Sequence, residues 1–157
     1  MFIFREEELN KRRKGFAQAS KPVEDDKESL ASIKSAISFM QSGKVPFEQF
    51  IIKVGNCMQF QIHQFQELLP YIYHDDQSVK LFALVGMRKL LSIENTPPIQ
   101  EVIDANLINV FINFLHHEIP KFQFEAAWCL TNVASGSTDH VNNLIEKGVL
   151  KHFIALL

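Results

Sequence analysis

The sequence predicts an all-α protein built from stacked helical repeats. From Pro46 onward, apolar residues recur at helical spacing, without the alternating runs and hairpin turns of strands. The pattern of apolar residues itself recurs, with a period of about 42 residues. A residue type that tolerates the left-handed conformation, Asn106 or Gly148, precedes two of the repeated segments.

The composition fits one globular domain of ordinary size. The 157 residues are 46% hydrophobic and 22% charged. The net charge of -2 gives no overall reason to expect nucleic acid as a partner. No apolar run approaches the length that spans a bilayer, and "MFIF" passes directly into "REEE", so we expect neither membrane insertion nor a secretory leader. Cys57 and Cys129 lack metal or redox spacing, which favours a reducing compartment.

The N-terminal region has the composition of a tail. Residues 5–14, "REEELNKRRK", place acids first and bases last without an apolar stripe, which suits a solvated, partly helical segment or a basic segment that docks on an acidic surface. Residues 15–29 resemble a linker in their content of Gly, Ser, Pro and charge. We assign residues 1–45 to a flexible basic tail and linker. A short amphipathic helix before Gly43 is predicted by Leu30, Ile33, Ile37 and Met40.

Three segments share one apolar pattern. "LINVFINFL" (107–115) aligns with "VLKHFIALL" (149–157), which places Phe111 on Phe153, and "FQELLPYIY" (65–73) has the same pattern one period earlier. The residues before two of the copies also agree, since "VIDAN" aligns with "LIEKG". A period near 42, three helical segments in each period and an Asn or Gly stop indicate armadillo-type repeats.

These repeats predict a right-handed solenoid with a concave groove, because each repeat buries its apolar face on its neighbour. We place the repeats in residues 46–148, with repeat one at about 64–106 and repeat two at 107–148. Residues 149–157 would form the first helix of an incomplete third repeat. Its apolar residues would lack a neighbour to pack against, so we expect a truncated chain or a partner that covers this end.

Trp128 is the single tryptophan of the chain and lies four residues before Asn132. On a helix these two side chains project side by side, either buried together or forming a polar and aromatic platform. An indole face attracts a lysine or arginine cation, by roughly 0.5–2 kcal/mol. An amide offers both a donor and an acceptor to the backbone of an extended peptide.

Three stretches resemble the importin-alpha family, the adaptors of nuclear import. "QFEAAWCLTNVASG" (123–136) resembles the family's second armadillo repeat, and "RKLLSIENTPPIQEVI" (88–103) resembles the first, including the double proline. "REEELNKRRK" (5–14) resembles the end of the segment that binds importin-beta, with its self-inhibiting basic cluster at Lys11, Arg12 and Arg13. The three stretches occur in the family's order.

The resemblance implies a groove that binds the basic nuclear localisation signals of cargo proteins. It places Trp128 and Asn132 in peptide contact, with Ser135 and Gly136 lining the same groove. It also implies that the peptide leaves the groove near Leu91, Ser92 and Glu94. A shift of about 40 residues makes Arg88 and Ser92 the repeat-one equivalents of Trp128 and Asn132. Further implications are importin-beta as a partner, the basic cluster as an internal competitor for the groove, and localisation in cytoplasm and nucleus.

The sequence offers no signal for catalysis. It contains no glycine-rich phosphate loop, no nucleophile arrangement and no histidines at metal-ligand spacing on one helix face, although "HHE" and "HDD" occur at predicted helix ends. We therefore expect no enzyme activity, no metal and no cofactor. Nucleic-acid binding through residues 5–14 is weak as a hypothesis, because three glutamates dilute the bases. The alternative to a cargo adaptor is an armadillo scaffold or regulatory module that pairs through residues 149–157 and carries no cargo.

Overall fold

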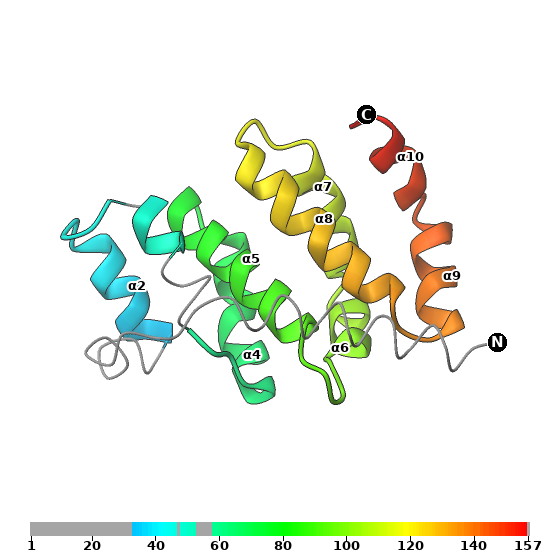
Figure 1. Ribbon diagram of the computed structural model, residues 1–157, viewed down its shortest axis with the longest axis horizontal. Helices are drawn as coiled ribbons and strands as arrows, with labels where there is room; N and C mark the ends of the chain where they lie inside the picture. Colours follow the sequence, from blue (N-terminus) through cyan, green and yellow to red (C-terminus); the bar gives the residue numbers. More distant parts are fainter. Residues whose placement is uncertain (1–32, 47, 53–57, 157) are drawn as a thin grey trace.

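Every regular element in the computed structural model is helical within the residues it describes, which are 33–46, 48–52 and 58–156 (Figure 1). The predicted all-α class is therefore confirmed. Within these ranges, none of the helices combines the length and the hydropathy that crossing a bilayer requires. The elements are α2 (Ile33–Gln41), η2 (Ile62–Gln64), α4 (Phe65–Leu68), η3 (Leu69–Tyr73), α5 (Gln77–Leu91), α6 (Ile99–Asp104), α7 (Leu107–Leu115), α8 (Pro120–Ala134), α9 (Thr138–Glu146) and α10 (Val149–Ile154).

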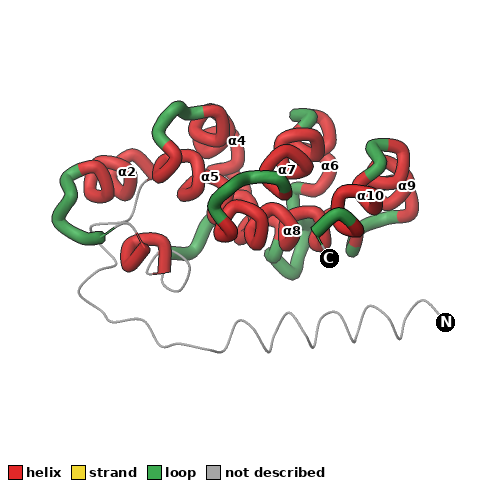
Figure 2. The backbone as a smooth tube through the Cα atoms, turned by 90° about the horizontal axis from the view of Figure 1, so that it is seen from above, coloured by secondary structure: helices red, strands yellow, loops and turns green. Residues whose placement is uncertain are grey.

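The helices form two layers. Figure 2 shows α5 and α8 beside each other in one layer, with α4, α6 and α7 in the other. α5 and α8 are the longest described helices, with 15 residues each, and α8 packs against both α5 and α7. The succession α7, α8, α9 therefore repeats the succession of α4 with η3, α5 and α6. This is the stacked arrangement of three helical segments that the sequence period predicts.

Helix boundaries follow local sequence chemistry. The Asp76 carboxylate accepts a hydrogen bond from the Ser78 amide at 2.7 Å and caps α5. Asn106 (φ 55°) and Gly148 (φ 69°) both adopt the left-handed conformation, directly before α7 and α10. The predicted Asn and Gly stops are therefore confirmed, one period apart, and they reverse the chain in the same way in both repeats.

The N-terminal boundary of the packed region was predicted wrongly. Residues 33–41 are helix α2 in the hydrophobic core, although the sequence-based division assigned residues 1–45 to tail and linker. The amphipathic stripe of α2 buries Ile33, Ala36, Ile37 and Met40. Helical residues 48–52 extend this packing, since the Phe50 ring lies 6.3 Å from Phe39 and 6.0 Å from Phe82 of α5. Packing an apolar stripe on a core is favourable, and a stripe that stayed in a solvated linker would not gain this free energy of burial.

Polar contacts join equivalent positions of successive repeats. Asn132 of α8 bonds Ser92 at the end of α5 at 3.0 Å, and His140 of α9 bonds Gln100 of α6 at 3.3 Å. The two partners are the same distance apart in sequence in both pairs, at 40 positions. Stacking therefore brings the same part of each repeat together, which is how the two repeats share one core.

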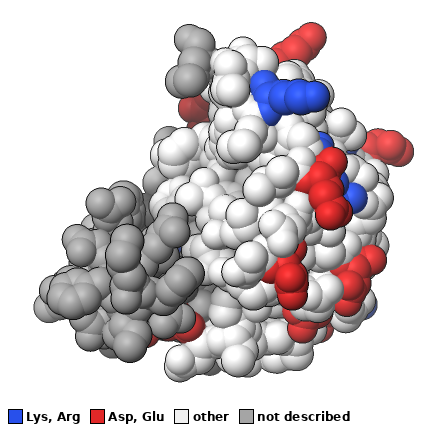
Figure 3. Space-filling view, turned by 90° about the vertical axis from the view of Figure 1, so that its right-hand side faces the viewer, with Lys and Arg blue, Asp and Glu red and all other residues white. Residues whose placement is uncertain are grey.

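The end of the solenoid beyond α8 presents an apolar surface. Figure 3 shows this end of the molecule as mostly uncharged. A groove of about 190 Å³ lies between α8, α9 and α10, and Leu130, Leu144 and Phe153 are among its lining residues. Leu150 and Ile154 of α10 are 63% and 69% exposed. Their equivalents one period earlier, in α7, are buried beneath α8, so this end has the composition of a surface on which a further helix packs.

Candidate functional site

Two of the predicted site residues, Asn132 and Ser92, meet across the seam between α5 and α8. Trp128 and Asn132 lie on α8, followed by Ser135 and Gly136 in the turn that ends this helix. Leu91 and Ser92 end α5. Glu94 is exposed in the loop that follows. The remaining predicted residues, Lys11, Arg12 and Arg13, lie outside the described residues.

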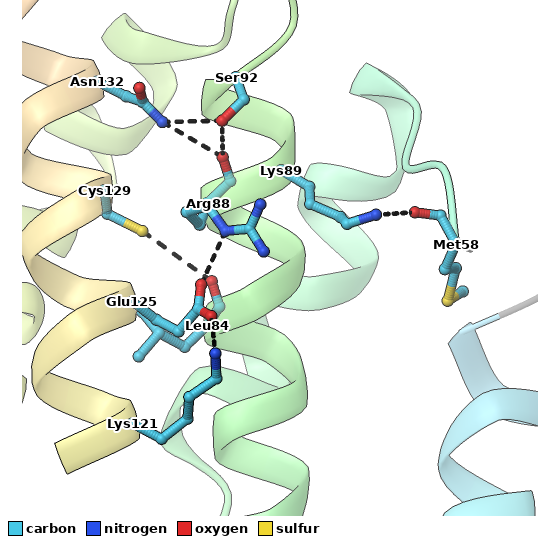
Figure 4. A network of polar contacts seen from close by, with 9 residues as sticks. All are labelled: Met58, Leu84, Arg88, Lys89, Ser92, Lys121, Glu125, Cys129 and Asn132. Carbon is cyan, nitrogen blue, oxygen red and sulfur yellow. Dashed lines mark hydrogen bonds and ion pairs between the residues drawn. The ribbon is translucent and has the colours of Figure 1, made fainter. Parts of the chain in front are cut away.

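A buried carboxylate holds two cations at this seam. Glu125 of α8 is 1% exposed and bonds the Arg88 Nε atom of α5 at 2.8 Å and the Lys121 Nζ atom at 2.8 Å (Figure 4). The Arg88 side chain is 13% exposed and the Lys121 side chain is 42% exposed. The trio therefore carries one net positive charge at neutral pH, and the Arg88–Glu125 pair links the two repeats with a charge-assisted bond.

The Trp128 indole is half-buried and already receives a cation. The Arg88 guanidinium carbon lies 4.7 Å from the centroid of the indole ring. The Phe124 ring, one turn earlier on α8, meets the indole edge-on at 5.5 Å. Phe124 is 54% exposed, and the Lys121 Nζ atom lies 5.0 Å from the centroid of its ring. Two cations and two aromatic rings thus share one strip of α8 and α5.

Asn132 is buried rather than open, with 7% of its surface exposed. Its Nδ2 group donates to the Ser92 Oγ atom at 3.0 Å and, more weakly, to the Arg88 carbonyl at 3.5 Å. The Ser92 hydroxyl donates its hydrogen to the Arg88 carbonyl at 2.8 Å. Its oxygen can therefore only accept a hydrogen bond from Asn132. This order of donors fixes which way the amide faces, and Figure 4 shows Oδ1 pointing away from Ser92.

The other predicted residues have mixed roles. The Leu91 side chain is fully buried in the core, so its predicted contact with a peptide is wrong for the side chain; it continues the apolar stripe of α5. Ser135 caps α8 and donates from its hydroxyl to the Asn132 carbonyl at 2.7 Å. A Cβ atom at Gly136 would collide with the His140 ring and lie 3.0 Å from Ile99. Gly136 therefore permits the close packing of the α8–α9 turn.

Cys129 lies in the interior behind this strip. Burial, together with the Glu125 carboxylate, raises the pKa of the Cys129 thiol well above its ordinary value. The thiol stays neutral and packs as a small apolar group, with its sulfur 4.0 Å from the Leu84 carbonyl oxygen. Because the pKa is higher in the folded state, the thiol favours the fold below its ordinary pKa, and this contribution falls as pH rises above it.

We expect Cys129 to resist thiol reagents in the folded protein. In a Cys57→Ser background, Ellman's reagent should modify the native chain more than about a hundredfold more slowly than the denatured chain, since access requires opening of the α5–α8 seam. The absorbance of the released thiolate at pH 8 and pH 10 measures both rates. Rapid stoichiometric modification of the native chain would contradict the burial of this thiol.

Sequence reasoning named Arg88 as the repeat-one equivalent of Trp128 but missed its pairing with Glu125. It also missed Lys121 and Phe124. The helical spacing of four residues could have found Phe124 beside Trp128 and Lys121 beside Glu125. The contact of Arg88 with Glu125 joins residues 37 positions apart and depends on the docking of α8 on α5. In the described ranges, no group of three or more histidine, cysteine, aspartate or glutamate side chains is arranged to hold a metal ion.

Comparisons with known proteins agree with this architecture. Residues 95–135 match the armadillo/beta-catenin-like repeat family. The fold and the stacked helical units thus define an armadillo-repeat protein.

Curated relatives narrow the class further. The chain is 38% identical over 120 residues to importin subunit alpha-2 of Arabidopsis thaliana, which covers 75% of this chain and 22% of the relative. It is 37% identical over 138 residues to importin subunit alpha-1 of Schizosaccharomyces pombe, covering 88% and 21%. It is 53% identical over 87 residues to importin subunit alpha-4 of Arabidopsis thaliana, covering 55% and 16%. The chain belongs to the importin-alpha family, and it spans about a fifth of the length of these relatives.

Proposed function

We propose that this chain is an adaptor of nuclear protein import and binds basic localisation signals along the strip formed by α5 and α8. The observation that carries the proposal is the Trp128 indole, which lies half-buried at the seam and receives a guanidinium on its ring at 4.7 Å. A ring in this setting attracts cationic side chains, by roughly 0.5–2 kcal/mol for each contact. Membership of the importin-alpha family supports the same function.

Asn132 supplies the backbone contact in this proposal. Because Ser92 and the Arg88 carbonyl hold its Nδ2 group, the Oδ1 atom is the part of the amide left to accept a peptide N–H. Binding through the backbone tolerates many peptide sequences, whereas the aromatic ring selects long cationic side chains. Glu94, which is exposed in the loop after α5, would favour a basic residue of the peptide.

The basic cluster at Lys11, Arg12 and Arg13 is proposed as an internal competitor for the strip. Residues 14–32 lie between this cluster and helix α2, and they would serve as its tether. Tethering at this length gives an effective concentration near the millimolar range, by an order-of-magnitude estimate. The same segment would contact importin-beta, and the adaptor would move between cytoplasm and nucleus.

A peptide titration tests the proposed function. We expect a lysine-rich peptide to change the fluorescence of Trp128, and to bind weakly because the described strip holds a single Trp–Asn pair. Replacing Trp128 with leucine should weaken binding about tenfold, the equivalent of about 1.4 kcal/mol, when a labelled peptide is followed by anisotropy. Ser92→Ala should also weaken binding, since it frees the Asn132 amide to rotate.

A peptide with glutamine in place of every lysine serves as the control and should not bind. Deleting residues 1–20 removes the internal competitor and should tighten binding of the basic peptide. If the basic peptide neither alters the spectrum nor binds after that deletion, the adaptor function is refuted, and an armadillo scaffold without cargo becomes the better interpretation.

A further inference from the structure

The Lys121 ammonium group occupies a cation site beside Phe124, which lies one helical turn before Trp128. Its Nζ atom lies 2.8 Å from the Glu125 Oε1 atom and 5.0 Å from the centroid of the Phe124 ring. A carboxylate oxygen and an aromatic face together attract an ammonium group. Phe124 is 54% exposed, so this site opens to solvent on the same strip of α8 as the indole.

We propose that Phe124 and Glu125 form a second cation subsite, which Lys121 fills until a lysine of a bound peptide displaces it. The inference rests on the proposed function, because it concerns the same peptide. It makes Phe124 and Glu125 specificity-determining residues and Lys121 an intramolecular competitor. The selected ligand is an extended peptide with a lysine beside the one that contacts Trp128.

Spacing supports a shared peptide. The Phe124 and Trp128 ring centroids are 5.5 Å apart. In an extended chain, side chains on one face recur every second residue, at roughly 6.4–6.8 Å. Two lysines separated by one residue therefore reach the two rings at once with little bending of their long, flexible stems.

Lys121 is suited to displacement. Its side chain is 42% exposed, so water can solvate its ammonium group when that group leaves the Glu125 carboxylate. It lies in the first turn of α8, where the helix dipole disfavours a cation, and on the unfavourable side of its i,i+4 partner. Glu125 keeps its bond to Arg88 at 2.8 Å whichever ammonium group occupies the site. One ammonium replaces another, so Lys121 masks much of the affinity that the subsite contributes.

Removing Lys121 should expose that affinity. We expect Lys121→Met to tighten binding of a peptide with lysines at alternate positions by about threefold to tenfold, as the size of one cation–π contact suggests. The matched control is Lys151→Met, which removes the same charge from an exposed position on α10 and should change affinity by less than about twofold because salt screens it. Adding Phe124→Leu to Lys121→Met should cancel the gain.

Anisotropy of the labelled peptide with the full chain, at fixed ionic strength, reports all four affinities. The inference is overturned if Lys121→Met matches Lys151→Met, or if the gain survives Phe124→Leu, which would show a general charge effect. If the unmodified chain binds in a Trp128-dependent manner while Lys121→Met brings no gain, the subsite fails and the proposed function stands. If neither the unmodified chain nor Lys121→Met binds, both fail together.

Discussion

Phe111→Ala is expected to lower the free energy of unfolding by about 4 kcal/mol, the typical cost of removing a buried phenylalanine. Phe111 lies on α7 with 0% of its surface exposed, within the core that both repeats share. The substitution removes apolar surface from the core and leaves a cavity that the packed neighbours of α7 fill only in part.

Phe153 is the matched control for this prediction, because it occupies the same position one period later. It is half-buried and lines the apolar groove at the end of the solenoid. Phe153→Ala should therefore cost only about 1 kcal/mol, as a partly exposed side chain loses less apolar burial.

Urea denaturation followed by circular dichroism measures the loss of unfolding free energy for both variants. The comparison requires that all variants have the same m-value. Equal costs at every protein concentration would contradict the difference in burial between the two positions. A cost at Phe153 that grows with protein concentration would instead show that two chains pair through α10.

Glu125→Gln is expected to lower the free energy of unfolding by about 3 kcal/mol. Removing one partner of a buried ion pair leaves the other cation without compensation, at a cost of about 3–5 kcal/mol. The lower end of this energy range applies because the Arg88 side chain is 13% exposed and is partly in contact with water. Lys121 loses the same carboxylate, but its exposed ammonium group finds water at little cost.

Two further variants separate charge from shape at this seam. Lys121→Met, which keeps the buried Arg88–Glu125 pair, should cost less than about 0.5 kcal/mol. The double variant Arg88→Met with Glu125→Leu should recover much of the stability that Glu125→Gln loses, since apolar residues of similar volume replace buried ion pairs well. A double-mutant cycle of Arg88→Met and Glu125→Leu, measured by urea denaturation, gives the coupling energy between Arg88 and Glu125. A coupling energy near zero would mean that the Arg88–Glu125 pair does not stabilise the contact between the two repeats.

Local chemistry explains the predictions that succeeded. Asn106 and Gly148 were expected to stop helices because their residue types tolerate positive φ, and both adopt it. Helical spacing placed Trp128 and Asn132 on one helix, and α8 carries both. These properties depend on residues a few positions apart.

The misassigned residues depend on contacts over long sequence distances. Leu91 was expected near the peptide, yet α5 turns its side chain into the core. Asn132 was expected open in the groove, but Ser92, which lies one repeat earlier, binds its amide at 3.0 Å. Residues 33–41 were expected to form an amphipathic helix within the linker; the helix is confirmed, but it packs on the core, where Phe39 contacts Phe50. In each case the spacing of the sequence allowed either outcome.

The amino-acid sequence by itself determined the helical class, the repeat period, the left-handed stops and the pairing of Trp128 with Asn132 on one helix, because turns and helical faces are set by neighbouring residues. Only the tertiary structure decided that Arg88 lies over the indole and that Glu125 is buried between Arg88 and Lys121. The physical reason is that the docking of α8 on α5 excludes water from their seam. This exclusion determines which polar groups bond within the protein and which remain for a ligand.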